Sequence, residues 1–375
     1  MDRPALLEWL KLIRTPGLGP VRISRLLRHF GGAQAMLEAT EQAWEGVPDI
    51  QLPFLHKILR LRREMPEEPL RQELDRLTDL GGHLLVLGDA AYPPLLQEIH
   101  DPPPALFVLG DPGHLSHTNS LAVVGSRQAT PAGGRFAYQL AMGLAQQGLA
   151  TISGLAEGID TAAHWGALEG RGVTVAVLAT GLDVLYPSRN APLRQRIIAQ
   201  GALVTEAPLG TPPAAYLFPP RNRIISGLSR GVAVVEAALR SGSLVTARLA
   251  LEQGREVFAV PAQVGDARYQ GSNHLLQQGA TYLEKVEDIL QAFAWDPRPP
   301  TLTPRATPNR TETPVAVGTE SAAVHALLKQ GPVQADELAR RSHLTVAALS
   351  RILLQLELVG VVQRLPGNQF ALRRV

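Results

Sequence analysis

Three short polar segments could bind phosphate, because each directly follows a run of apolar residues. Glycine lets the backbone approach an oxyanion closely, a helix N-terminus offers free N–H groups, and an arginine adds a charged fork. The residues in these segments are, in chain order, Gly125, Ser126 and Arg127, then Ser153 and Gly154, then Gly181. Together they predict a site for a phosphate-bearing ligand. Tight turns between strands and helices are the alternative explanation, since such turns also need glycine and small polar residues.

A second cluster combines an aromatic ring with positive charge. Phe218 is followed by Arg221, Asn222 and Arg223. An aromatic near two arginines at alternate positions suits a stacked base with phosphates beside it. The alternative is that an arginine pairs with a buried carboxylate such as Glu206 or Glu236, and we expect at least one of the two arginines to be structural.

The elements that must position these residues alternate between strand and helix over residues 101–294. Helices are expected between the strands, for example over residues 134–147 and 158–169. The expected strands are residues 121–124, 150–152, 173–178, 202–205, 232–235 and 257–260. Their almost purely apolar composition indicates a parallel sheet covered on both faces. Ligands of such sheets bind at the carboxyl ends of the strands, where the three polar segments lie.

The flanking segments differ in composition. Residues 1–100 are expected to form a helical domain, in which the turn over residues 15–20 joins two helices in the manner of a helix-hairpin-helix. Such a turn can offer N–H groups to a DNA phosphate, or it can simply be a packing turn. Residues 295–319 are rich in Pro and Thr and predict an extended linker. Residues 320–375 predict a winged helix, with helices over 323–329, 336–341 and 345–358 and two strands around residues 366–368. The third of these helices carries little charge, which favours a protein-interaction or auxiliary DNA role over base readout.

The composition excludes several classes of protein. The formal net charge is +2, so any polyanion site must be local, and the absence of cysteine excludes disulfides and Cys-ligated zinc. No stretch reaches the roughly 20 apolar residues that span a bilayer, and the N-terminus lacks the apolar core of a signal peptide. We therefore expect a cytoplasmic protein without membrane association.

Five segments in the middle of the chain resemble the successive signatures of the DNA-processing protein A (DprA) family and occur in the family's order. They are SGLAEGIDTAAHWGAL, TGLDVLYPSRN, FPPRNRIISGLSRGVAVVEA, SGSLVTARLALEQGREVFAVP and GSNHLLQQGA. The resemblance implies an α/β protein with a Rossmann-like parallel sheet, an N-terminal helical domain of the sterile-alpha-motif or helix-hairpin-helix type, and a C-terminal winged helix. It implies a non-enzymatic homodimer that binds and protects incoming single-stranded DNA, binds double-stranded DNA less well, and helps to load the recombinase RecA in natural transformation or repair.

The same resemblance places the DNA-binding residues. It implies a groove formed by Gly125, Ser126, Arg127, Ser153, Gly154, Gly181, Tyr186, Arg189, Asn190, Phe218, Arg221, Asn222 and Arg223. The chain departs from the family pattern at two places. Ser188 and then Arg189 follow the Tyr-Pro pair, where family members often have lysine, so Arg189 is expected to take that phosphate contact. Residues 132–134 are Ala-Gly-Gly, where an aromatic often stands before glycine.

Other interpretations of the sequence remain open. A nucleotide-hydrolysing enzyme on a similar scaffold, or a winged-helix transcription regulator, are the alternative functions. Asp160 and His164 are expected to be structural, and no catalytic residue, metal or cofactor is expected, since no spacing of His or Asp resembles a metal site. Leu275, Leu276 and Val286 are the predicted dimer face, although ordinary core packing would explain them as well.

Overall fold

The computed structural model describes residues 2–47, 52–262 and 265–294. In the C-terminal part it describes residues 333–342, 362–365 and 369–372, together with Val324, Leu327, Leu328, Gly331, Leu344, Leu349 and Leu353. The chain divides into two compact units, Met1–Thr301 and Leu302–Val375, which are considered separately.

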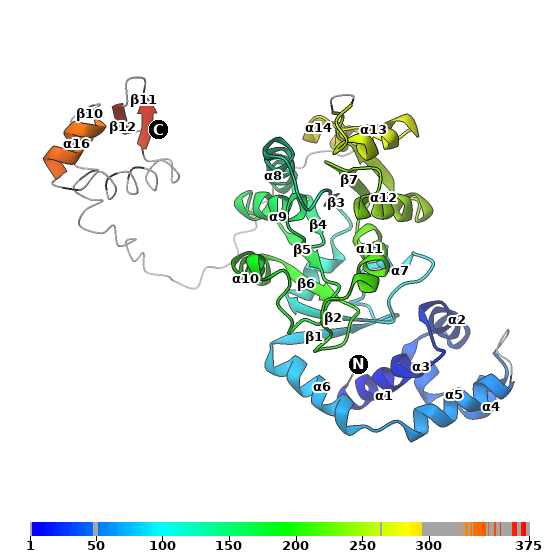
Figure 1. The fold of residues 1–375 in the computed structure, drawn as a ribbon. Coiled ribbons are helices and arrows are strands. Elements are labelled where there is room, and N and C mark those ends of the chain that lie inside the picture. Colours follow the sequence, from blue (N-terminus) through cyan, green and yellow to red (C-terminus); the bar gives the residue numbers. More distant parts are fainter. Residues whose placement is uncertain are drawn as a thin grey trace. The chain divides into compact units, whose positions relative to one another are not determined.

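The first unit is built on a nine-stranded sheet with the strand order β1-β2-β6-β5-β4-β3-β7-β8-β9 (Figure 1). The strands are β1 (Gly82–Val86), β2 (Ala105–Gly110), β3 (Ser120–Val124), β4 (Ala150–Ser153), β5 (Thr174–Val177), β6 (Ala202–Thr205), β7 (Gly231–Val234), β8 (Glu256–Ala259) and β9 (Thr281–Tyr282). In this spatial order, all neighbouring strands from β6 through β5, β4, β3, β7 and β8 to β9 pair in parallel. All six strands expected from the sequence are confirmed, with ends that differ by at most one residue.

The strands β1 and β2 extend this sheet in the antiparallel sense. Gly82 pairs with Leu109 and Val86 with Ala105, and β2 in turn pairs with β6. The expectation that residues 1–100 are helical is therefore wrong for β1, and the sheet begins before residue 101. The four-residue apolar run 84–87, at the end of a helical region, has no period that distinguishes a strand from a helix turn.

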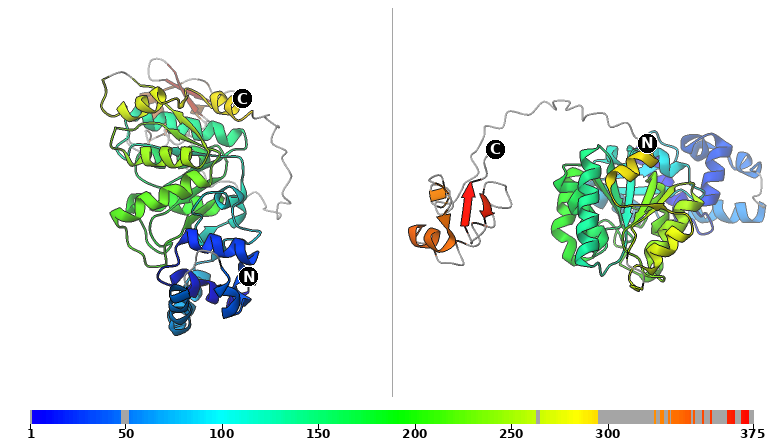
Figure 2. Two further views of the ribbon diagram at one scale, coloured as in Figure 1. Left: turned by 90° about the vertical axis from the view of Figure 1, so that its right-hand side faces the viewer. Right: turned by 90° about the horizontal axis from the view of Figure 1, so that it is seen from above.

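Helices cover both faces of the sheet (Figure 2). One face carries α8 (Pro131–Gln146), α9 (Ile159–Glu169), α10 (Ala191–Gln200) and α14 (Val286–Ala292), and the other carries α7 (Pro94–Gln97), α11 (Phe218–Gly227), α12 (Gly242–Glu252) and α13 (Gln270–Gln277). Successive side chains of β3 point to opposite faces, so that Leu121 and Val123 pack with α8 and α9, while Ala122 and Val124 pack in the other core. The strands are apolar on both sides because both sides are buried.

The N-terminal helices form a small bundle beside β1. They are α1 (Arg3–Arg14), α2 (Pro20–Phe30), α3 (Ala33–Glu38), α4 (Glu41–Glu45), α5 (Leu52–Glu64) and α6 (Glu68–Asp79). The turn between α1 and α2 is confirmed. Arg22 Nη1 donates to the Gly17 carbonyl at 2.6 Å, and the Arg22 guanidinium lies 4.6 Å from the centre of the Phe54 ring. This turn thus packs on α5, and its contact with DNA stays a prediction.

The second unit contains a three-stranded sheet in the order β10-β12-β11. Its described elements are β10 (Val333–Gln334), α16 (Ala335–Ser342), β11 (Val362–Leu365) and β12 (Gln369–Leu372). They confirm the expected second helix and the two expected strands of the winged helix. The expected linker over residues 295–319 and most of the expected third helix lie outside the described residues. Within the described parts of the chain, no helix has the length and apolar character needed to span a membrane.

Candidate nucleic-acid interface

The loops that follow β3, β4 and β7 meet where the order of the strands reverses. From β3 the chain continues to β4, β5 and β6 on one side, and it then returns to place β7 on the other side of β3. Ligands bind at such a switch point in open α/β sheets. Gly158 allows the loops to approach, since it has φ of 83° and a Cβ at this position would lie 2.2 Å from the Ser126 carbonyl oxygen. Ile159 N donates to that same oxygen at 3.1 Å.

Two adjoining clefts open at this edge, and they share Arg127, Ala156, Phe218 and Arg221 as lining residues. The aromatic cleft has a volume of about 440 Å³ and is further lined by Gly154, Glu157, Leu178, Ala179, Thr180, Leu185, Tyr186, Pro187 and Ser188. The serine cleft has a volume of about 390 Å³ and is further lined by Val124, Gly125, Ser126, Asp160, Pro219, Asn222, Ile225, Ala238, Arg240, Ser241, Gly242, Ser243, Val245 and Thr246. The first is mainly apolar and aromatic, while the second is rich in glycine and hydroxyl groups.

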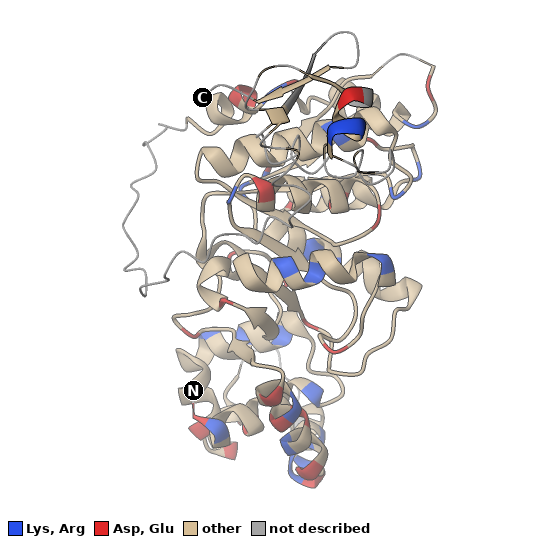
Figure 3. Cartoon of the chain, turned by 90° about the vertical axis from the view of Figure 1, so that its left-hand side faces the viewer, with Lys and Arg blue, Asp and Glu red and all other residues tan. Residues whose placement is uncertain are grey.

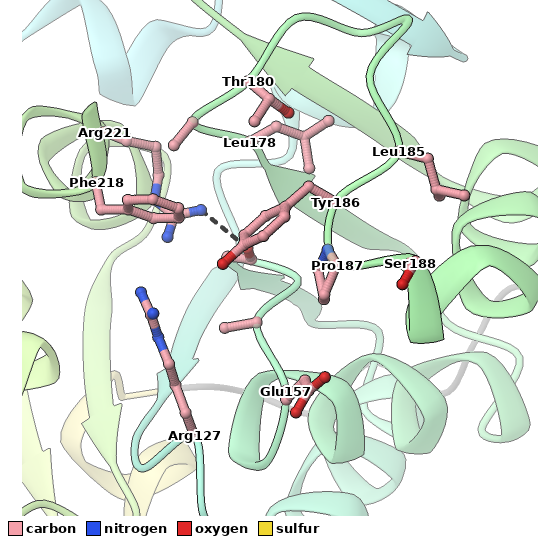
Figure 4. A pocket seen from close by; sticks show the side chains of 13 residues that line it. Arg127, Glu157, Leu178, Thr180, Leu185, Tyr186, Pro187, Ser188, Phe218 and Arg221 are labelled. Carbon is pink, nitrogen blue, oxygen red and sulfur yellow. Dashed lines mark hydrogen bonds between the residues drawn. The ribbon is translucent and has the colours of Figure 1, made fainter. Parts of the chain in front are cut away.

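Arg127 is the exposed cation of the shared wall. Its guanidinium lies 5.0 Å from the centre of the Phe218 ring, and the Tyr186 ring lies 5.9 Å from that of Phe218 (Figure 4). A cation over an aromatic face is attracted to the ring, which orients Arg127 while leaving its N–H groups available. Arg127 is thus suited to bind a phosphate next to a base that stacks on Phe218.

Arg221 is the buried cation of the same wall. Its Nη1 donates to the carbonyl oxygens of Gly154 and Val177. Burial lowers the pKa of Arg221 to about 10, with Asp160 acting in the opposite direction, so the side chain stays charged at neutral pH. A Cβ on Gly154 would lie 2.7 Å from Nη1, so a larger residue there would displace the Arg221 guanidinium.

Asp160 lies beneath this wall and fixes the loop after β4. It is 6% exposed and accepts hydrogen bonds from Gly154 N at 3.1 Å and Ala156 N at 3.3 Å. Burial raises the pKa of Asp160, and the charge of Arg221 opposes that rise. The expectation that Asp160 is structural agrees with these bonds.

Arg223 does not reach either cleft. It donates to Glu206 Oε2 at 2.6 Å and to Asp101 Oδ2 at 2.9 Å. The segment is the helix α11, and side chains two positions apart on a helix point in nearly opposite directions. The expectation that one arginine is structural is therefore met by Arg223, and its pairing with Glu206 is as expected.

The expected pairing of Glu236 with Arg221 is wrong. Glu236 Oε2 accepts hydrogen bonds from Thr130 N at 3.0 Å and Thr130 Oγ1 at 2.9 Å, on the far side of the sheet edge from Arg221. The charge that acts on Arg221 comes instead from Asp160.

The structure brings eight of the thirteen sequence-derived residues to the clefts. They are Gly125, Ser126, Arg127, Gly154, Tyr186, Phe218, Arg221 and Asn222. Four others support the surrounding loops or the core. Three of them donate hydrogen bonds to backbone carbonyl oxygens, namely Ser153 Oγ to Val123, Gly181 N to Thr211 and Asn190 Nδ2 to Leu155. The fourth, Arg223, forms the ion pair described above. Arg189 has a side chain that is 82% exposed and lies 3.8 Å from Glu157, beside the aromatic cleft.

The loop after β7 also contributes to the site, although none of its residues is among the thirteen sequence-derived site residues. Arg240 is exposed and lines the serine cleft, and Ser241 caps α12, whose N-terminus opens into that cleft. Free N–H groups and the helix dipole favour an anion there. Serine before a helix start is a capping signal, but only the fold places Ser241 and Ser243 in the same cleft as Gly125 and Arg127.

Charge elsewhere on the molecule gives little further guidance. Among the described residues, Lys and Arg are interspersed with Asp and Glu rather than gathered in one block (Figure 3). No group of three or more His, Cys, Asp or Glu that could hold a metal ion occurs in the described ranges. The anion-binding potential of the switch point is therefore local, as the net charge of +2 requires.

His164 and the predicted dimer residues lie away from the clefts. His164 is fully buried with its Nδ1 2.7 Å from Thr174 Oγ1, and burial lowers its pKa to about 3. Its hydrogen-bond partner is thus Thr174, in agreement with the expected structural role. Leu275 is 7% exposed and packs in the core, while Leu276 and Val286 are partly buried against it. The dimer face stays a prediction.

Comparison with known proteins gives a consistent result over most of the chain. The model of the DNA recombination-mediator protein A family matches residues 83–294, that of the DprA winged helix domain matches residues 306–368, and that of the DprA-like N-terminal HHH domain matches residues 4–50. Protein Smf of Escherichia coli (strain K12) is 43% identical over 314 residues, which are 82% of this chain and 82% of that protein. DNA processing protein DprA of Bacillus subtilis (strain 168) is 37% identical over 66% of this chain and 87% of its own length.

Two solved structures share the fold. DNA processing protein A from Streptococcus pneumoniae superposes with a TM-score of 0.68 at 35% identity, over 76% of this chain and 96% of that one. DNA processing protein A from Helicobacter pylori, studied for its single-stranded DNA binding mode, has a TM-score of 0.52 at 29% identity, over 58% of this chain and 98% of that one. The family models matched in all three domains, together with these relatives and structures, show that this chain belongs to the DNA recombination-mediator protein A family.

Proposed function

We propose that the chain binds single-stranded DNA in the two clefts, with bases in the aromatic cleft and backbone phosphates at the serine cleft. The observation that carries this proposal is the shared wall, in which the Phe218 ring lies 5.0 Å from the Arg127 guanidinium and 5.8 Å from that of Arg221. Aromatic rings between cations are the combination that binds an unpaired strand without regard to sequence. The single-stranded DNA binding of the Helicobacter pylori relative supports the same conclusion.

Single-stranded DNA fits this site better than a duplex does. Phe218 is half-buried within the clefts, so a base must leave its stack to reach the ring. A free strand can turn its bases outward, whereas a duplex must first unstack and unpair them. We expect tighter binding of single-stranded DNA, with an affinity that falls as salt rises because phosphate contacts release counterions.

The bound strand is the substrate for a recombination mediator. The family to which the chain belongs supports a role in which it protects incoming single-stranded DNA and helps to load the recombinase RecA during transformation. We propose that it acts in the cytoplasm as a homodimer, with the surface beside Leu275, Leu276 and Val286 as the face between the two copies. RecA-dependent strand exchange on DNA covered by single-strand-binding protein, with and without the chain, tests this role.

The contents of the clefts support binding rather than catalysis. The carboxylates that line them are Glu157 and Asp160, and Asp160 already accepts two backbone N–H groups. General acid–base hydrolysis needs a positioned pair of groups with free proton-transfer capacity. Release of nucleobase or phosphate from mononucleotides would revive the hydrolase alternative.

Fluorescence anisotropy with a labelled 20-mer oligothymidine and a duplex of equal length, across a salt series, tests the proposed binding. The expected result is tighter binding of the single strand at every salt concentration. Equal binding of both forms, or tighter binding of the duplex, contradicts the proposal. A chain truncated before residue 302, at the boundary between the two units, tests the regulator alternative, which requires binding to be lost.

A further inference from the structure

Glu236 is a fully buried carboxylate that lines neither cleft. It lies two residues after the end of β7 and is 0% exposed. Burying a charged carboxylate carries a large desolvation penalty unless hydrogen bonds and nearby positive charge offset it. The groups that contact this carboxylate therefore indicate its role.

Glu236 binds both ends of the loop that carries Arg127. Its carboxylate Oε2 accepts from Thr130 N at 3.0 Å and from Thr130 Oγ1 at 2.9 Å. Its backbone carbonyl accepts from Ser126 N at 2.7 Å. Arg127 lies between these two anchors, so a single residue fixes the start and the end of its loop.

The adjoining helix is built to receive this carboxylate. Thr130 caps α8, with Gly133 N donating to Thr130 Oγ1 at 3.0 Å, so the carboxylate lies at the positive end of the helix dipole. A Cβ on Gly133 would lie 2.5 Å from Glu236 Oε2, and this is the stretch where the sequence has Ala-Gly-Gly. Glycine in the first turn of α8 thus makes room for the charged group.

A third element holds the same cluster. The Tyr269 hydroxyl lies 2.9 Å from Thr130 Oγ1, and α13 begins at the next residue, Gln270. Thr130 Oγ1 gives its one hydrogen to Glu236, so the Tyr269 hydroxyl donates to Thr130. Glu236 Oε1 has no hydrogen-bond partner. The hydrogen bonds that Thr130 donates to Oε2 are therefore the contacts that hold this carboxylate in place.

We propose that Glu236 is a positioning residue for single-stranded DNA, which holds the 126–130 loop so that Arg127 lies over Phe218 and between the two clefts. Glu236 itself does not touch the strand. Arg127 is exposed, and among the described residues its cation–π contact with Phe218 is the one interaction that orients its side chain, so the conformation of the loop decides where its guanidinium lies. This inference rests on the proposed function, in which Arg127 binds a phosphate.

A double-mutant cycle separates positioning from a general loss of structure. The variants are Arg127→Ala, Glu236→Ala and the double variant, measured by anisotropy on the labelled 20-mer beside the wild type. We expect each single variant to weaken binding about tenfold or more, and the double variant to bind no more weakly than Arg127→Ala, because both changes remove the same contact. Glu236→Gln keeps a carbonyl oxygen for Thr130 and is expected to restore most of the affinity.

The outcomes distinguish this inference from the proposed function. If the wild type does not bind single-stranded DNA, the proposed function fails. If the wild type binds but Glu236→Ala binds equally well, or its effect adds to that of Arg127→Ala, the positioning role alone is refuted. Should Glu236→Ala not fold, as judged by circular dichroism, Thr130→Val takes its place in the cycle and Thr130→Ser is its matched control. Thr130→Val is then expected to weaken binding without adding to Arg127→Ala, and unchanged or additive binding overturns the inference.

Discussion

Replacing Arg127 with alanine removes one exposed guanidinium from the wall between the clefts and disturbs little else. The described structure gives Arg127 only its contact with the Phe218 ring at 5.0 Å, so its loss leaves no buried group without a partner. A hydrogen bond to a charged group contributes about 1.5–3 kcal/mol, which corresponds to a loss of affinity of about 10- to 100-fold. Loss of one phosphate contact also lowers the slope of log K against log salt by about 0.7 for a single strand.

Arg248→Ala is the matched control for this variant. Arg248 lies on α12 outside both clefts, and its side chain is 69% exposed and pairs with Glu252 at 3.5 Å. Both variants change the net charge equally, so only a local contact makes them differ. Anisotropy of the labelled oligothymidine between about 50 and 300 mM salt measures affinity and slope together. If Arg127→Ala and Arg248→Ala have the same affinity and salt slope, Arg127 binds no phosphate, and the shared wall of the clefts is not the DNA-binding surface.

Three further predictions address stacking, the buried arginine and pH. Phe218→Ala is expected to lose about 1–3 kcal/mol of binding free energy with no change in salt slope, as measured by the same titration. Tyr216→Ala is the control, because Tyr216 is 75% exposed and lies outside both clefts. An equal loss of affinity in both variants refutes stacking on Phe218. Arg221→Ala is expected to lower the free energy of unfolding in urea by about 3 kcal/mol, because it leaves Asp160 and two carbonyl groups uncompensated; an unchanged urea midpoint contradicts this. The pKa of His164 is lowered to about 3 from 6.5, so the unfolded chain takes up the proton first as the pH falls from 6.5 towards 3. The free energy of unfolding is therefore expected to decrease by up to about 1.4 kcal/mol per pH unit relative to that of His164→Gln. Parallel pH profiles of the two proteins would refute this prediction.

The position of the site could be predicted from the sequence because its signals are local. Each apolar run ends at a glycine or serine, and parallel strands bring their carboxyl ends to one edge. Gly125, Ser126, Arg127 and Gly154 therefore reach the clefts as expected.

The division of roles between neighbouring arginines could not be predicted in the same way. Arg221 and Arg223 are two residues apart, and their separation into a cleft residue and an ion-pair residue depends on α11 being a helix. The hydrogen bonds between Thr130 and Glu236 could not be predicted either, since the two residues are 106 positions apart. The antiparallel strand β1 was missed because its pairing with β2 depends on tertiary contacts rather than on a period in the sequence.

The wall shared by the two clefts has a consequence for how affinity depends on ligand length. Arg127 and Phe218 border both clefts, so a group that fills one of them immobilises side chains that the other also uses. A neighbouring nucleotide on the same strand then enters at a high effective concentration and meets residues that are already ordered. Binding should therefore rise steeply, rather than in proportion, between a mononucleotide and an oligonucleotide long enough to occupy both clefts, and free nucleotides should compete poorly with the strand.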